Sequence, residues 1–103
     1  MNKTIPIISI VSIVGVIFAY TQDGIDYRGV LHENGCVDVY AKSNIPKIAK
    51  VEITLFYTLK GYSGVHKYGP ITNETTIDSR DKIVLTACTK GEYQGHSFKV
   101  SKK

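Results

Sequence analysis

Tryptophan is absent from this sequence of 103 residues, and cysteine, methionine and proline are scarce, with two, one and three copies. The motifs of common enzyme classes are also missing. The chain has no G-x-S-x-G, no H-E-x-x-H, no P-loop and no G-x-G-x-x-G. Its three histidines are spread along the chain beside polar residues, which is typical of exposed histidines. We therefore expect that the protein is not an enzyme and needs no cofactor.

Long runs of charge of one sign are absent as well. The 13 Lys and Arg and nine Asp and Glu give a formal net charge of +4, and both signs are interspersed. The only basic run is "KVSKK", Lys99–Lys103, at the end of the chain, which we interpret as a solvated tail. This pattern does not favour a nucleic-acid partner.

One long apolar run is present at the start. Lys3 precedes an uncharged stretch, Ile5–Tyr20, which is typical of a segment that directs export. Two interpretations stay open: a signal peptide cut after Ala19, or an uncleaved membrane anchor slightly shorter than the roughly 17 to 25 residues of a spanning helix. A buried core element is less favoured, because the rest of the chain offers little apolar surface to cover such a run.

These observations divide the chain into a leader, residues 1–22, and an exported domain, residues 23–103. The predicted location is outside the cytoplasm, either anchored to the membrane through the N-terminal segment or secreted. The leader makes the membrane the first predicted partner.

The exported segment has a strong β pattern. In Lys50–Lys60, apolar residues alternate with mostly polar ones over the whole stretch, which predicts a half-buried strand. One face is predicted to carry Val51, Ile53, Leu55, Tyr57 and Leu59. Phe56 is the exception on the polar face.

Shorter strands are predicted on both sides of this one. Ile25–His32 and Cys36–Lys42 flank Asn34-Gly35, a strong signal for a hairpin turn. Further strands are predicted at Val65–Thr72, Thr75–Asp78, Lys82–Thr89 and His96–Lys102, with the first interrupted at Gly69-Pro70. Six or seven short strands predict an all-β fold, and we expect a small immunoglobulin-like sandwich.

The two cysteines are predicted to form a disulfide bond. Cys36 and Cys88 both lie in the exported segment, and an oxidising compartment favours their pairing. In each predicted strand, the cysteine falls on the face opposite to the more apolar residues. We therefore expect the bridge at an edge or outer face of a sheet, not as a pin between two sheets.

A metal site is the sharpest alternative for the same stretch. "CTKGEYQGHSFKV", Cys88–Val100, resembles the ligand loop of cupredoxins, which are exported β-sandwich copper proteins. The resemblance implies that Cys88 and His96 take the first and last ligand positions. The histidine expected a few residues after the cysteine is missing, and a blue-copper centre needs two histidines beside the thiolate. A metal-binding redox protein stays the alternative to a disulfide-bonded domain.

Tyrosine is the aromatic residue in excess, with seven copies. Tyr62, Tyr68 and Tyr93 lie in or near glycine-containing loops beside lysines, and a tyrosine with a polar tip is a good anchor at a binding surface. Packing of the same rings over the ends of the sandwich is the other interpretation. The predicted binding surface consists of Tyr62, Tyr68, Tyr93, Lys60, Lys67 and Lys90.

Asn73 begins the sequon Asn-Glu-Thr and is a possible N-glycosylation site on a predicted loop. Together, the sequence predicts a small exported domain, tethered to a membrane, with a binding or structural role at the cell surface. Its partner would be a protein or a surface polymer. An immunity or inhibitor protein that acts outside the cytoplasm is a second alternative.

Overall fold

The computed structural model describes residues 14–102 and contains seven β-strands and no helix in that range. The strands are β1 Gly15–Gln22, β2 Ile25–Leu31, β3 Cys36–Ser43, β4 Lys47–Thr58, β5 His66–Ile77, β6 Lys82–Cys88 and β7 Glu92–Lys102. The predicted all-β class is confirmed.

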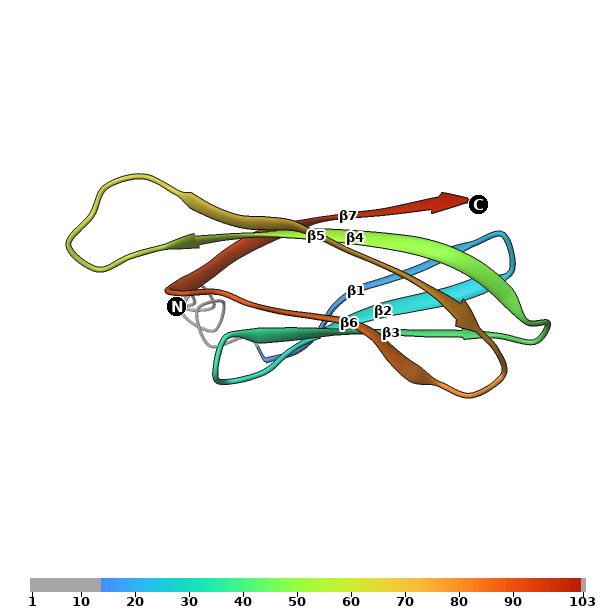
Figure 1. Cartoon of the computed structure of the whole chain (residues 1–103). Coiled ribbons are helices and arrows are strands. Elements are labelled where there is room, and N and C mark those ends of the chain that lie inside the picture. Colours follow the sequence, from blue (N-terminus) through green and yellow to red (C-terminus); the bar gives the residue numbers. More distant parts are fainter. Residues whose placement is uncertain (1–13, 103) are drawn as a thin grey trace, which may run out of the picture.

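The strands form two antiparallel sheets that lie over one another as two layers (Figure 1). One sheet has the order β1-β2-β3-β6 and the other has the order β5-β4-β7. The edge strands β5 and β6 approach each other on one side of the sandwich, as the contacts between them show. The other two edge strands, β1 and β7, lie on the opposite side.

The core lies between the sheets and follows the alternation of the strands. In β4, Val51, Ile53 and Leu55 have no exposed surface, whereas Glu52 and Thr54 between them reach the outside. Ala49 of β4 and Ile77 of β5 also belong to the core. Opposite this sheet, the inner faces of β2, β3 and β6 contribute the other members of the core. Its members there are Ile25, Tyr27, Leu31, Val37, Val39, Ala41, Val84, Leu85 and Ala87. The predicted inner face of the long strand is confirmed from Val51 to Tyr57, whereas Leu59 lies beyond the end of β4 and is only partly buried.

Strand β1 lies in the segment that the sequence assigned to the leader. Gly15–Gln22 pairs along β2, from Gly15 opposite Leu31 to Gln22 opposite Ile25. The sheet therefore includes eight residues on the leader side of the expected boundary after residue 22. Residues 1–13 lie outside the described range, and the signal peptide and the anchor stay predictions.

Strand β5 is one continuous strand, not the two short strands that the sequence suggested. It runs from His66 to Ile77 and passes through Gly69-Pro70, which has a cis peptide bond. A β-bulge in the pairing with β4 takes up the irregularity at this point. Gly69 has φ +117°, and a side chain there would collide with the carbonyl oxygen of Ile53, so this position requires glycine.

The predicted immunoglobulin-like arrangement is not confirmed. In an immunoglobulin constant domain, the first, second, fifth and fourth strands share one sheet. Here the first, second, third and sixth strands share it. What the structure supports is the coarser description, a small two-sheet β-sandwich.

Within residues 14–102, no helix is long and apolar enough to cross a membrane. The predicted transmembrane helix is therefore not found in the part of the chain that the structure describes.

Candidate binding surfaces and the disulfide

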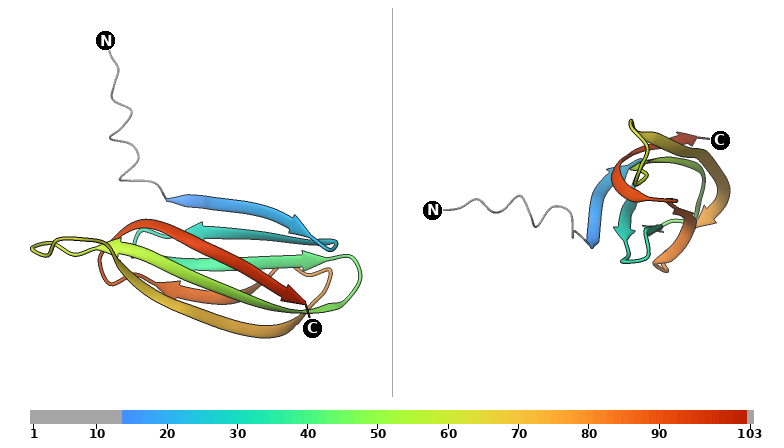
Figure 2. Two further views of the ribbon diagram at one scale, coloured as in Figure 1. Left: turned by 90° about the horizontal axis from the view of Figure 1, so that it is seen from above. Right: turned by 90° about the vertical axis from the view of Figure 1, so that its left-hand side faces the viewer.

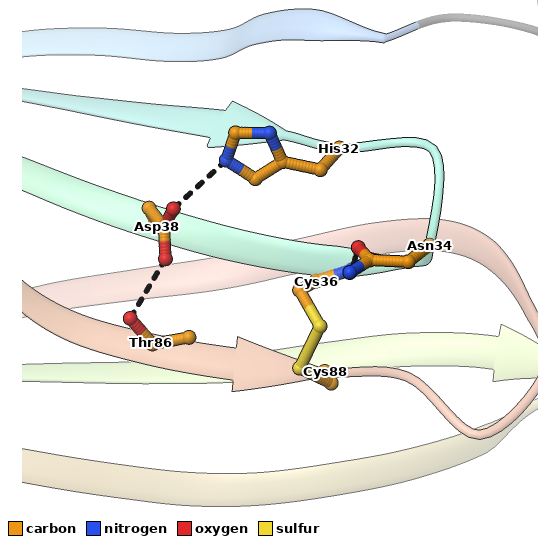
Figure 3. Close-up of polar contacts among 6 residues, drawn as sticks. All are labelled: His32, Asn34, Cys36, Asp38, Thr86 and Cys88. Atoms are coloured by element: carbon orange, nitrogen blue, oxygen red, sulfur yellow. Dashed lines mark hydrogen bonds and ion pairs between the residues drawn. A yellow bond between two sulfur atoms is a disulfide. The ribbon is translucent and has the colours of Figure 1, made fainter.

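The disulfide bond between Cys36 and Cys88 is present, as predicted. Cys36 is the first residue of β3 and pairs with Cys88, the last residue of β6 (Figure 3). The next residues, Val37 and Ala87, point into the core, so the cysteines are on the outer face of the four-stranded sheet. The bond joins two neighbouring strands of one sheet, as the phase of the two strands predicted.

The turn before Cys36 is held by local hydrogen bonds. The backbone N–H of Cys36 donates to the side-chain oxygen of Asn34 at 3.0 Å, and the N–H of Gly35 donates to the carbonyl oxygen of His32. This is the hairpin predicted from Asn34-Gly35. It fixes the start of β3, and with it the position of Cys36.

A polar chain crosses the outer face beside the disulfide (Figure 3). One carboxylate oxygen of Asp38 lies 2.8 Å from Nε2 of His32, and the other accepts a hydrogen bond from the Thr86 hydroxyl at 2.7 Å. The hydroxyl thus donates to the carboxylate and not to the imidazole. These contacts form a cross-strand network that links β3 and β6 to His32, the residue that follows β2.

The copper alternative requires a free Cys88 thiolate, and the disulfide removes it. Over residues 14–102, no group of three or more His, Cys, Asp and Glu is arranged to hold a metal ion. The disulfide therefore excludes the ligand role implied by the cupredoxin resemblance while Cys36 and Cys88 are oxidised.

Four of the six residues predicted for a binding surface lie at one end of the sandwich. Lys60 and Tyr62 lie in the loop between β4 and β5, Lys67 is near the start of β5, and Lys90 lies in the loop between β6 and β7. All four are exposed, and Tyr62 is 70% exposed. The β4–β5 hairpin projects beyond the other loops (Figure 1). We call residues Leu59–Lys67 the hairpin tip.

The other two predicted residues, Tyr68 and Tyr93, pack against the core. Tyr68 lies opposite Leu55 and Tyr93 lies opposite Tyr57, so both rings are on the inner face of the three-stranded sheet. Burial raises the pKa of the Tyr93 phenol. The structure therefore brings Lys60, Tyr62, Lys67 and Lys90 to one end and places the two other tyrosines at the sandwich interior.

An aromatic cluster, which the sequence analysis missed, fills the side between β1 and β7. Phe18 of β1 stacks on Phe98 of β7 with ring centroids 4.6 Å apart, and Tyr27 lies 5.5 Å from Phe98. A cleft of about 310 Å³ is lined by Phe18, Ala19, Tyr20, His96 and Phe98. Three of these residues were assigned to the leader, which hid the cluster from sequence reasoning.

Two polar groups in and beside this cluster have altered pKa values. Nδ1 of His96 lies 2.7 Å from the Tyr93 hydroxyl, and burial lowers the pKa of His96. Tyr27 is 2% exposed, and its hydroxyl has no hydrogen-bond partner among the described residues. Burial, and then the charges of Asp23 and Tyr20, raise the pKa of Tyr27 to about 12.

A second hollow, of about 290 Å³, lies on the outer face of the four-stranded sheet, and Arg28 and Asp81 are among its lining residues. The Arg28 guanidinium is 4.3 Å from the centroid of the Tyr40 ring and 2.8 Å from a carboxylate oxygen of Asp81. Both charged groups are partly exposed, so the ion pair contributes little to stability. Together, the ion pair and the cation–π contact connect the Arg28 side chain of β2 to Asp81 and to Tyr40 of β3.

Asn73 lies within β5 and not in a loop as expected. Its side-chain amide donates to the carbonyl oxygen of Val84 at 2.7 Å and so joins the edges of β5 and β6. The nitrogen that a glycan would modify is engaged in this bond. Glycosylation of Asn73 stays a prediction, and it would have to replace a contact that closes the sandwich.

No protein-family model matches this sequence, and neither curated proteins nor solved structures give a significant match.

Proposed function

We propose that this protein is a small non-enzymatic binding domain that works outside the cytoplasm and is held at a membrane by its apolar N-terminal segment. The hairpin tip is the observation that carries the binding role. Tyr62 and Val65 are 70% and 62% exposed there, although both are large enough to stabilise a core. Exposed apolar side chains that gather on a projecting loop are typical of interaction sites.

The disulfide bond supports a location outside the cytoplasm. Bonds of this kind persist in oxidising compartments and are rare where thiols are kept reduced. Cys36–Cys88 is also a closed pair with no other cysteine in the chain, so it has no exchange partner within the protein. These features fit a structural disulfide in an exported domain.

The apolar N-terminal run supports attachment to a membrane. β1 begins at Gly15, and the part of the uncharged run that precedes it in the sequence is Ile5–Val14. A run of this length is shorter than a spanning helix and is more typical of an interfacial segment or the apolar part of a signal peptide. Attachment without a full span is therefore the form of tether that we propose.

Fractionation of cells that express the full chain tests the location. We expect the protein to sediment with membranes and to be digested by protease that is added on the side of the membrane facing away from the cytoplasm. A protein that stays in the cytosolic fraction and is protected from protease would overturn the proposal.

Cross-linking capture tests the binding role. Tyr62→Ala is expected to abolish capture of the partner without lowering the melting temperature, because Tyr62 makes no contribution to the core. Ile45→Ala is the matched control, since Ile45 is 66% exposed in the loop between β3 and β4 at the other end. Equal loss of capture in both variants would contradict a site at the hairpin tip.

A further inference from the structure

The hairpin tip combines an apolar apex with basic flanks. Tyr62 and Val65 are its exposed large side chains, and Lys60 and Lys67 are the exposed charges on either side. No Asp or Glu occurs between Leu59 and Lys67. Below the apex, the His66 ring stacks on Tyr57 with centroids 5.7 Å apart, so the base of the hairpin is fixed to the sandwich while the apex is free of packing.

The described chain also begins at this end of the molecule. Gly15, the first residue of β1, lies opposite Leu31, which immediately precedes the turn between β2 and β3. That turn and the hairpin tip are at the same end of the sandwich, and Figure 2 shows β1 starting on that side. A segment preceding Gly15 that is held at a membrane would therefore bring this end toward the lipid.

The loops at the two ends differ in charge. Asp23, Asp78 and Asp81 occur in the loops at the far end, with Arg80 as the only basic residue there. The near-end loops contain Lys60 and Lys90 with Glu33 as the only acidic residue. The strands beside the far loops nevertheless begin or finish with lysines, at Lys47, Lys82 and Lys102, so the far end as a whole is not acidic. The feature that favours a negatively charged surface is therefore local to the hairpin tip, where no acidic residue accompanies the lysines.

We propose that the hairpin tip docks on the surface of an anionic lipid bilayer, with Tyr62 and Val65 in the interfacial layer and Lys60 and Lys67 at the headgroups. This inference rests on the proposed function, because the N-terminal tether would present the near end to the membrane. Tyrosine is enriched at membrane interfaces, where its ring meets lipid and its hydroxyl meets water. Lysine can extend its apolar stem along the interface while its charge pairs with anionic lipid.

A single tryptophan reports the contact directly, because the natural chain has none. The full-length Tyr62→Trp variant would be mixed with vesicles of phosphatidylcholine and phosphatidylglycerol that carry bromine on their acyl chains. We expect the indole emission to move to shorter wavelength and to be quenched by the bromine. The full-length Ile45→Trp variant, at the far end, is the matched control and is expected to keep a water-exposed, unquenched emission.

Flotation of the same samples separates this inference from the tether. If the protein floats with the vesicles but the Tyr62→Trp emission is unquenched, the tether stands and the docked hairpin is overturned, which would leave the tip to a protein partner. If the protein does not float, both the tether and the docking are overturned. Equal quenching of both variants would show a domain lying without orientation on the lipid, which also contradicts the proposal.

The basic flanks give a second readout. In the Tyr62→Trp background, Lys60→Gln and Lys67→Gln are each expected to lower the ratio of docked to undocked hairpin about fivefold, as measured by quenching. Lys42→Gln, which removes an exposed lysine from the far part of β3, is expected to leave that ratio unchanged. Quenching that is insensitive to both Lys60→Gln and Lys67→Gln, or equal with and without phosphatidylglycerol, would rule out recognition of anionic lipid.

Discussion

His96 is a single residue whose position in the fold makes the stability of the domain depend on pH. The sequence placed it at the start of a strand, where a histidine is commonly exposed. In the structure β7 begins earlier, at Glu92, and carries His96 into the aromatic cluster between the sheets. Its ring lies 5.0 Å from that of Phe18, and its Nδ1 contacts the Tyr93 hydroxyl. Burial there disfavours the charged imidazolium.

This environment predicts a loss of stability in mild acid. Because the pKa of His96 is lowered in the folded protein, the unfolded chain binds a proton at a pH where the folded protein does not. The melting temperature should therefore be insensitive to His96 above its ordinary pKa of 6.5 and should fall as the pH drops below that value. Thermal melts of wild type and His96→Gln at a series of pH values measure the effect.

The substitution His96→Gln is expected to flatten the pH dependence of the melting temperature just below the ordinary histidine pKa of 6.5. Asp78 cannot account for a change in that range. The backbone N–H of Arg80 lowers the pKa of the Asp78 carboxyl below its ordinary 3.8, so the stability that it contributes is lost only in stronger acid. An identical pH profile for wild type and variant would contradict the buried position of His96.

At the scale of elements, β1 is where the leader and the sheet compete for the same residues. Cleavage after Ala19 would remove Phe18, whose ring stacks on Phe98 and closes the side between β1 and β7. Retention of β1 predicts that Phe18→Ala destabilises the mature protein by about 1 to 3 kcal/mol, less than a fully buried phenylalanine because its ring is half-buried. Urea denaturation measures this difference.

Gly29 provides an independent check on the same strand. It lies opposite Phe18 in β2, and a Cβ added there would come within 2.2 Å of the Phe18 ring. Gly29→Ala should therefore be destabilising when Phe18 is present and tolerated when the chain starts at Tyr20. Mass spectrometry of the mature protein shows whether the purified chain retains Phe18 or starts at Tyr20. If neither substitution changes stability in a chain that retains Phe18, the described β1 packing is wrong.

The elements that the sequence predicted correctly are those whose signal is local. The alternation in Lys50–Lys60 identified β4 and its buried face, and Asn34-Gly35 identified the β2–β3 hairpin. β1 was missed because an uncharged run without alternation has the same composition as a leader. β5 was divided in two because Asn73-Glu74 was interpreted as a loop, and its first half was expected to be interrupted at Gly69-Pro70. The bulge and the edge position allow the strand to continue.

At the scale of the whole molecule, the order of the strands in the two sheets could not be predicted from the sequence. Hairpins join strands that are neighbours in the sequence, but β3 pairs with β6 and β4 pairs with β7, which are separated from them by two intervening strands. The predicted binding surface likewise contained one part that local sequence could predict and one part that depends on strand pairing. Exposure of Tyr62 follows from its glycine-rich loop, whereas the inward positions of Tyr68 and Tyr93 depend on the register of β5 and β7 against β4. The disulfide was predictable because only two cysteines could pair.

That disulfide is the largest single covalent restraint on the fold. Cys36 and Cys88 are separated by 52 positions, so the bond shortens a long loop in the unfolded chain. Loop-closure entropy predicts that Cys36→Ala with Cys88→Ala lowers the free energy of unfolding by about 3 to 4 kcal/mol. Little packing should be lost, because both sulfur atoms lie on the outer face. Urea denaturation of wild type and the double variant, with and without dithiothreitol, measures the change.

Dithiothreitol should lower the stability of the wild type to that of the double variant and leave the variant unchanged, since the only bond that it can reduce is Cys36–Cys88. A loss of this size is a large part of the roughly 5 to 15 kcal/mol that stabilises a typical domain. The reduced domain would therefore be poorly folded in a reducing compartment, which ties stability to export. Two free thiols in the denatured, non-reduced protein isolated from its own compartment would contradict both the bond and the proposed location.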